Sequence, residues 1–158
     1  MEKSKKYISN AEAYTKITKW CAYQERAQQE VRDKLYDFGL HKEEVEQLLT
    51  RIISEGFVNE ERFAISFANG KLNQLGWGRI KISYALKSKR LSDYCIKKAL
   101  KSLDESKYKE MLEDAYLKRA KMEKEKHPLK RKYKLISYLS GRGFEQDLIN
   151  QIIKDASE

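Results

Sequence analysis

The sequence predicts an all-α protein made of three tandem three-helix repeats, each containing a helix-turn-helix-like pair, in an elongated array that can curve. Three observations support this prediction. The 158 residues include one proline and seven glycines, so little interrupts helix formation. Apolar residues recur at spacings of three and four, the period of an α-helix. The same apolar pattern also occurs three times along the chain, as in repeat proteins.

Three helices are expected before residue 56. Ser9 and Glu12 have the spacing of a capping box, which predicts a helix from residue 9 to about residue 23. The second helix should end at Gly39, because glycine suits the left-handed residue that often closes a helix. The third should end at Gly56 for the same reason. Their apolar faces carry Val31, Leu35 and Phe38 in the second helix, and Val45, Leu48, Leu49 and Ile52 in the third.

The middle of the chain predicts three further helices. Asn59 is a favourable N-cap, and the two glutamates after it suit the positive end of a helix dipole. Gly76 and Gly78 separate this helix from the next one, and Ser92 offers a cap for the third. The apolar positions are Phe63 and Phe67, then Ile82, Ala85 and Leu86, and then Ile96, Ala99, Leu100 and Leu103.

The last third of the chain predicts one long and two shorter helices. A charged helix over residues 107–126 should stop before Pro128, because proline disfavours helical geometry in the residue before it. Helices over 130–140 and 145–156 should follow, separated by Gly141, Arg142 and Gly143.

The repeat becomes visible when three parts of the chain are aligned with offsets of 51 and then 53 residues. Six apolar columns then coincide: Val31, Ile82 and Leu135; Leu35, Leu86 and Leu139; Leu40, Leu91 and Phe144; Val45, Ile96 and Ile149; Leu48, Ala99 and Ile152; Leu49, Leu100 and Ile153. We therefore expect repeats over 1–55, 56–105 and 106–158. A repeated sequence does not fix how its units stack, so a compact nine-helix bundle remains an alternative.

The net charge of +9 is concentrated in two bands. Residues 1–70 hold 11 basic and 12 acidic groups, whereas residues 71–101 hold nine and one, and residues 118–134 hold nine and two. Such bands suit polyanionic partners, although solvated helix faces are the alternative explanation. The expected contacts with nucleic acid or a filament are Arg79, Lys81, Lys87, Lys89, Arg90, Lys97, Lys98, Lys101, Lys118, Arg119, Lys121, Lys130, Arg131, Lys132 and Lys134.

Two details of the bands give further expectations. Arg79, Ser83, Lys87 and Arg90 have the spacing of a shared helix face, turned away from the apolar positions. The aromatic residues Trp77, Tyr84, Tyr94 and Tyr133 could stack on exposed bases, but each taken alone is expected to lie in the core.

Nothing in the sequence predicts an active site. Cys21 and Cys95 lie far apart and are expected to be buried thiols, and His41 and His127 have no metal-ligand or triad partners nearby in sequence. We therefore expect no catalytic residues, no metal and no cofactor, and hence no enzyme. Without a long apolar segment, we expect a cytoplasmic protein that binds no membrane. The small exposed surface of the repeats and their solubilising charge favour a monomer.

Motifs in all three repeats resemble the RecX family. The central one runs Gly56-Phe57-Val58-Asn59-Glu60-Glu61-Arg62-Phe63-Ala64 and then Gly78-x-x-Lys81-Ile82-x-x-Ala85-Leu86-x-x-Lys89-Arg90-Leu91. The first repeat contributes Arg26-x-x-x-Glu30-Val31-x-x-x-Leu35, and the third contributes Lys134-Leu135-x-x-Tyr138-Leu139-x-x-Arg142-Gly143-Phe144. The chain departs from the family pattern at Asn59 and Glu60, where paired aspartates are frequent, at Lys81 (arginine), at Ala85 (glutamate) and at Arg90 (glycine).

The resemblance implies a helical regulator that lies along the RecA filament on single-stranded DNA and dampens its ATPase, strand-exchange and coprotease activities. Its expected partners are the RecA filament and single-stranded DNA, with double-stranded DNA as an alternative. Asn59, Glu60, Glu61 and Arg62 are expected to face protein, and the basic residues to face DNA or an acidic protein surface. The charge alone would equally suit a stand-alone, sequence-tolerant DNA or RNA binder, or a scaffold for acidic proteins.

Overall fold

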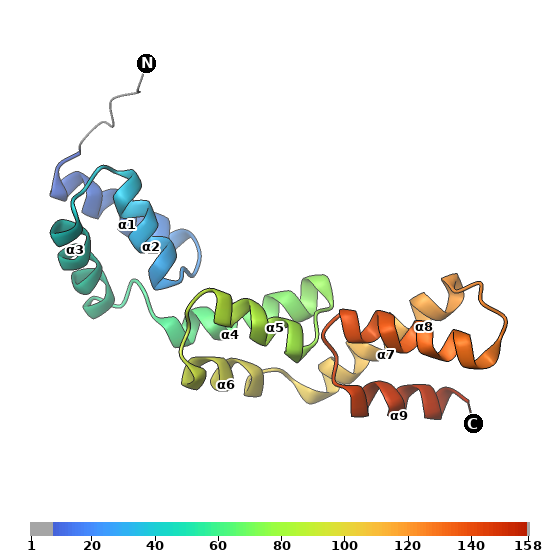
Figure 1. Cartoon of the computed structure of the whole chain (residues 1–158). Coiled ribbons are helices and arrows are strands. Elements are labelled where there is room, and N and C mark those ends of the chain that lie inside the picture. The colour runs from blue at the N-terminus through green and yellow to red at the C-terminus, as the bar shows by residue number, and fades with distance from the viewer. Residues whose placement is uncertain (1–7, 158) are drawn as a thin grey trace, which may run out of the picture.

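The computed structural model describes residues 8–157, which form nine α-helices and no strand (Figure 1). The helices are α1 (Asn10–Tyr23), α2 (Gln28–Asp37), α3 (Lys42–Ser54), α4 (Glu60–Leu75), α5 (Arg79–Ser88), α6 (Asp93–Lys101), α7 (Glu105–Met122), α8 (Pro128–Gly141) and α9 (Gln146–Ala156). The predicted all-α class is confirmed.

The helices form three groups that follow one another along an elongated molecule (Figure 1). We call α1–α3 the first unit, α4–α6 the second unit and α7–α9 the third unit. The first unit is set at an angle to the other two, so the array bends near its N-terminal end. The compact nine-helix bundle is therefore wrong, whereas the residue boundaries of the repeats stay a prediction.

Three helices begin at the capping residues expected from the sequence. The side chains of Ser9, Asn59 and Ser92 accept hydrogen bonds from backbone amides of the first turns of α1, α4 and α6. The long helix differs from the prediction at both ends. Asp104 caps α7, which begins two residues before the expected start and ends at Met122, before the expected end at residue 126. Helix α8 begins at Pro128, a residue well suited to a first helical position.

The left-handed residue after the second helix occupies the same position in each unit. Gly39, Arg90 and Gly143 coincide under the offsets of 51 and 53, and their φ angles are 87°, 65° and 95°. Arg90 is the one described non-glycine residue with a positive φ. The turn therefore keeps its geometry in the second unit, although it lacks the glycine that the conformation favours.

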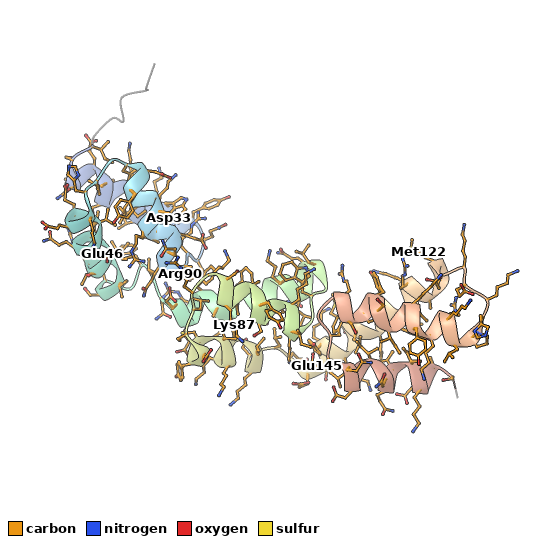
Figure 2. All side chains as sticks on the ribbon, in the orientation of Figure 1. Asp33, Glu46, Lys87, Arg90, Met122 and Glu145 are labelled. Carbon is orange, nitrogen blue, oxygen red and sulfur yellow. The ribbon has the colours of Figure 1, made fainter. Side chains whose placement is uncertain are left out.

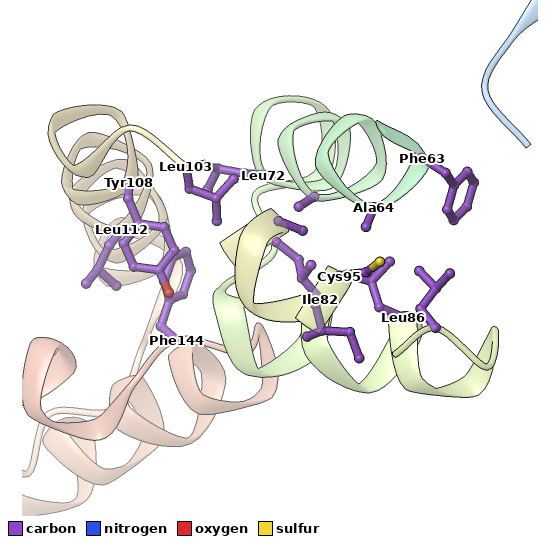
Figure 3. Close-up of a cluster of buried hydrophobic side chains, with 14 of the residues drawn as sticks. Phe63, Ala64, Leu72, Ile82, Leu86, Cys95, Leu103, Tyr108, Leu112 and Phe144 are labelled. Atoms are coloured by element: carbon purple, nitrogen blue, oxygen red, sulfur yellow. The ribbon is translucent and has the colours of Figure 1, made fainter. Parts of the chain in front are cut away.

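The repeat columns form the core. Every residue in the first five columns is buried, while Leu100 and Ile153 of the sixth column are only partly buried. All of the buried column residues except Leu135 belong to one of two separate clusters. One lies within the first unit, and the other runs through the second and third units and includes Ile82, Leu86, Tyr108 and Phe144 (Figure 3).

The second and third units meet where α8 ends and α5 begins; we call this contact the second junction. The backbone amide of Gly78 donates to the carbonyl of Arg142 over 2.8 Å, and that of Ile80 donates to the carbonyl of Gly143 over 2.9 Å. A Cβ atom on Gly78 would overlap the backbone of Gly143 and Phe144. This approach therefore requires glycine.

The first and second units meet differently, through side chains; we call this contact the first junction. The carboxylate of Glu60 accepts a hydrogen bond from the backbone amide of Gln28 over 2.9 Å. Lys89 lies 3.6 Å from a carboxylate oxygen of Glu30. In the described chain, no hydrogen bond between backbone atoms joins helices α1–α3 to helices α4–α6.

Candidate nucleic-acid interface

Helix α6 presents a basic face because its apolar and charged residues lie on opposite sides. Ser92 caps the helix by accepting a hydrogen bond from the amide of Cys95 over 3.2 Å. Cys95, Ile96 and Ala99 point into the core. The opposite side is exposed, and we call it the α6 face: Tyr94, Lys97, Lys98 and Lys101.

The lysines of the α6 face carry uncompensated charge. Within residues 8–157, no carboxylate oxygen lies within 4.0 Å of the ammonium groups of Lys97, Lys98 or Lys101. Lys98 instead has its ammonium group 5.6 Å from the centre of the Tyr94 ring. Uncompensated ammonium groups beside an exposed aromatic ring suit a partner with phosphates and bases.

The equivalent faces of the other units are not basic. The repeat offsets place Glu43, Glu46, Gln47 and Thr50 at these positions in α3, and Asp147, Asn150, Gln151 and Lys154 in α9. Only the second unit therefore turns the exposed side of its third helix into a cationic surface. The charge at these exposed positions thus differs between the three units, although all three units have apolar residues in the core columns.

The residues expected to share a face of α5 are in fact separated. Lys87 is exposed on α5, and Arg90 lies in the turn that follows it, close to the first unit (Figure 2). Ser83 is half-buried. Arg79 turns into the second junction, where its side chain is 18% exposed. The predicted shared face is therefore wrong for Arg79, because a periodicity cannot reveal an acidic partner from a distant helix.

Arg79 is held in the second junction by three groups. Its guanidinium contacts Glu145 at 2.7 Å and Glu105 at 2.5 Å, and lies 3.9 Å from the centre of the Tyr108 ring. The backbone amide of Arg79 donates to the Tyr108 hydroxyl over 3.0 Å, and that hydroxyl donates to Glu145. Burial, together with this hydrogen bond, raises the pKa of Tyr108 far above its ordinary value. The charge of Arg79 is therefore already neutralised within the protein.

Two other basic residues of the first band also have partners inside the protein. Lys89 pairs with Glu30 across the first junction, with an N–O distance of 3.6 Å. The ammonium group of Lys81 lies 4.6 Å from the centre of the Trp77 ring. The exposed residues of this band that have no carboxylate of residues 8–157 within 4.0 Å are thus Lys87, Arg90, Lys97, Lys98 and Lys101.

The basic residues of the second band surround Glu123, one of the two acidic residues of that band. Glu123 lies 3.5 Å from Arg119 and 3.8 Å from Lys134, and its backbone carbonyl accepts a hydrogen bond from Arg131 over 2.7 Å. Lys134 also lies 3.3 Å from Glu125. The turn before Pro128 thus brings basic residues together, but around carboxylates. Within residues 8–157, the exposed lysines of this band without such a partner are Lys118, Lys121, Lys124, Lys126, Lys130 and Lys132.

The tyrosines of the bands are not core residues. Tyr84, Tyr94 and Tyr133 have 70%, 60% and 62% of their surfaces exposed. The expectation of a core position is therefore wrong for these three, because each lies on the outer side of a helix whose opposite side carries the core columns. Trp77 is half-buried between Lys71 and Lys81.

Comparison with family models identifies the chain. Residues 59–100 match the second three-helix domain of RecX, and residues 106–153 match its third three-helix domain. Together these two matches cover more than half of the sequence. The chain belongs to the RecX family.

Individual relatives agree with this assignment. The RecX-family chain is 30% identical over 136 residues to the regulatory protein RecX of Clostridium acetobutylicum, covering 82% of this chain and 62% of the relative. It is 27% identical over 134 residues to RecX of Streptococcus uberis, covering 84% of this chain and 51% of the relative. The chain thus spans about half to three fifths of the length of these relatives.

Solved structures share the fold. The crystal structure of RecX from Lactobacillus salivarius superposes with a TM-score of 0.82 at 23% identity, covering 92% of this chain and 95% of that one. A crystal structure of another regulatory protein RecX gives 0.83 at 21% identity, covering 92% of this chain and 71% of that one. The elongated three-unit architecture is therefore shared with RecX proteins.

The helix start in the central RecX motif links the first two units. Asn59 caps α4 by accepting a hydrogen bond from the amide of Arg62 over 2.8 Å. Arg62 contacts Glu25 at 2.5 Å and donates to the carbonyl of Gly56 over 3.0 Å. Glu60 accepts the amide of Gln28, and Glu61 is half-buried. The expected protein contact of these residues stays a prediction, and their observed contacts are internal.

The other residues considered in the sequence do not form a metal site within residues 8–157. In the described part of the RecX chain, no group of three or more His, Cys, Asp or Glu side chains could hold a metal ion. Cys21 and Cys95 are buried free thiols, as expected. His127 is exposed and caps α8. None of the helices formed by residues 8–157 is long and apolar enough to span a bilayer.

The sequence alone did not reveal the residues of the second junction. Tyr108 and Glu145 are separated from Arg79 by 29 and 66 residues, and neither belongs to a charged band. Arg142, expected only between two helices and within a motif, also lies in this junction, where its guanidinium donates to the carbonyl of Leu75. The paired glycines at 78 and 143 were the available signal, because both lie beside helix ends.

Proposed function

We propose that this protein regulates RecA by binding its filament on single-stranded DNA and dampening the ATPase, strand-exchange and coprotease activities of the filament. Through these activities it would influence DNA repair and the SOS response. The observation that carries the proposal is the α6 face, an uncompensated cationic surface on an elongated chain of the RecX family. An elongated array offers a long surface, which suits a long partner such as a filament better than a compact partner.

The α6 face is assigned the DNA phosphates or the acidic surface of the filament, with Lys87 and Arg90 beside it. Within residues 8–157 these groups have no carboxylate within 4.0 Å, so binding a polyanion breaks no ion pair. Arg79, Lys89, Arg119 and Lys134 are assigned a smaller share of binding, because each is already paired with a carboxylate. Lys118, Lys121, Lys130 and Lys132 form a secondary cationic surface on the third unit.

The first test measures the ATPase rate of RecA on single-stranded DNA with substoichiometric amounts of this protein. A fall in the rate is expected, because one regulator bound to a filament affects many subunits. An unchanged rate on an active filament refutes the regulatory proposal. Tight binding to naked DNA with no effect on the filament would instead favour the stand-alone nucleic-acid binder.

The second test addresses the α6 face. The triple variant Lys97→Gln, Lys98→Gln and Lys101→Gln is compared with Lys16→Gln, Lys19→Gln and Lys42→Gln, which removes three exposed charges from the first unit. Affinity for a fluorescent oligothymidylate is measured by anisotropy at several salt concentrations. Since each phosphate contact contributes about 0.7 to the slope of log K against log salt on single strands, the first variant should lose roughly 2 from the slope.

The control variant should keep the slope of the unchanged protein. Equal losses in both variants would mean that binding depends on net charge alone. An unchanged slope in the α6 variant would place the nucleic-acid contact elsewhere. Circular dichroism of both variants checks that the helices are retained.

A further inference from the structure

The two junctions of the array lie at equivalent places in the repeat but are built from different groups. The offset of 51 makes Gly78 the counterpart of Ala27, and the offset of 53 makes Gly143 the counterpart of Arg90. Ala27 is completely buried, and Arg90 has a φ of 65°. The glycine pair of the second junction is therefore replaced by two residues with Cβ atoms at the first junction.

This replacement prevents the close backbone contact of the second junction from forming at the first. At the second junction, a Cβ on either glycine would overlap its neighbours: the Gly143 backbone for Gly78, and Lys81 for Gly143. The close approach allows two backbone hydrogen bonds of 2.8 and 2.9 Å between the units. At the first junction, no backbone hydrogen bond in the described chain joins the two sets of helices.

Three polar contacts take the place of those bonds: the hydrogen bond from the Gln28 backbone amide to the carboxylate of Glu60 over 2.9 Å, and two ion pairs between long, partly exposed side chains. Lys89 and Glu30 are 35% and 32% exposed and lie 3.6 Å apart. Arg62 and Glu25 are 48% and 29% exposed and lie 2.5 Å apart. Such pairs contribute little net stability and can re-form after a rotation, and salt weakens them. They therefore restrain the angle between the units less than backbone bonds do.

The hydrophobic core is also continuous across the second junction and divided near the first junction. One cluster of buried residues is continuous through the second and third units, where the Tyr108 and Phe144 rings lie 5.4 Å apart (Figure 3). The first unit has a cluster of its own. Among the fully buried residues, Ala27 of the first unit joins the larger cluster, and Val58, in the segment between α3 and α4, joins the smaller one. Two small side chains provide little apolar area to hold the units at one angle.

We propose that the first junction is a hinge about which the first unit pivots, while the second and third units move as one rigid body. The pivot lies in residues 55–59, between α3 and α4. It lets the angle between the nearly neutral first unit and the α6 face adjust to the surface of a partner. The hinge follows from the junctions alone and does not depend on the proposed function.

The test measures distances within the full chain by double electron–electron resonance. Cys21 and Cys95 are replaced by alanine, and spin labels are placed in pairs at the exposed positions Thr50 and Ser88, and Ser88 and Ser137. The first pair spans the first junction, and the second pair spans the second junction. The distance distribution of the first pair should be about twofold broader, as expected for a contact of low local stability.

Salt provides an independent readout. Raising the ionic strength from about 0.05 to about 0.5 M shortens the range of charge interactions and should broaden the first distribution further, leaving the second unchanged. The matched variant Gly78→Ala should broaden the second distribution only, since its Cβ would displace the Gly143 backbone.

Two results overturn the hinge. One is equal widths for the two pairs, whether both are narrow or both are broad. The other is a first pair that does not respond to salt. If the cysteine-free chain does not fold, small-angle scattering of the unmodified protein replaces the labels. A radius of gyration that changes with salt supports the hinge, and one that stays constant contradicts it.

Discussion

The left-handed turn at Arg90 gives a prediction with a calculable magnitude. Arg90 has a φ of 65°, a region in which a non-glycine residue is disfavoured by roughly 1–2 kcal/mol. Arg90→Gly removes this cost but adds backbone freedom in the unfolded chain, which offsets about 0.5–1 kcal/mol. The exposed guanidinium makes no hydrogen bond or ion pair with residues 8–157, so no contact is lost. The net gain should be about 0.5–1 kcal/mol.

The assay is thermal unfolding followed by far-UV circular dichroism. For a chain of this size the gain corresponds to a rise in Tm of roughly 1–4 °C. Gly39→Ala is the matched opposite change, because Gly39 occupies the equivalent position of the first unit with a φ of 87°. It should lower the Tm by a similar amount. A lower Tm for Arg90→Gly would refute the reasoning, since it would mean that the turn does not strain the arginine.

Three further changes test separate parts of the structure. Tyr108→Phe removes the buried hydroxyl that donates to Glu145, and should cost about 1–3 kcal/mol in urea unfolding; an unchanged midpoint would contradict this. Ser92→Ala removes the cap of α6 and should cost about 1 kcal/mol, with faster amide exchange in its first turn, whereas unchanged exchange would show that the cap is dispensable. The hydrogen bond from Arg32 lowers the pKa of Glu46, so Arg32→Gln should raise that pKa in an NMR titration, and an unchanged value would deny the contact. Because the folded pKa of Glu46 is depressed, its stabilising effect is present above the unfolded pKa and is lost as the pH falls through the folded value.

The helices and the core could be predicted because both depend on local sequence. The apolar columns are set by helical spacing within each unit, and residues such as Ile82 and Leu139 are completely buried as the repeat requires. Glycines and capping side chains act on neighbouring residues, so they mark the ends of most helices. The end of α7 could not be placed in this way, because the residues after Met122 stay outside the helix to accept hydrogen bonds from Arg131 and Lys134.

The candidate site could be predicted only as a set of basic residues. Which of them remain available depends on acidic partners that the fold brings from elsewhere: Arg79 meets Glu145 from a position 66 residues away. Lys97 and Lys101 have no acidic partner among residues 8–157, yet the sequence does not distinguish paired from unpaired basic residues. The exposure of Tyr94 likewise depends on which side of α6 faces the core.

The unequal junctions also affect how the chain acquires its structure. The second and third units share one buried cluster, so each leaves apolar surface exposed until the other is present. They should therefore form and unfold together in one cooperative step. The first unit closes a cluster of its own, which its three helices complete together with Val58 just after α3. As the chain leaves the ribosome, the first unit can fold on its own, whereas the unit that carries α6 must wait for the residues that follow it.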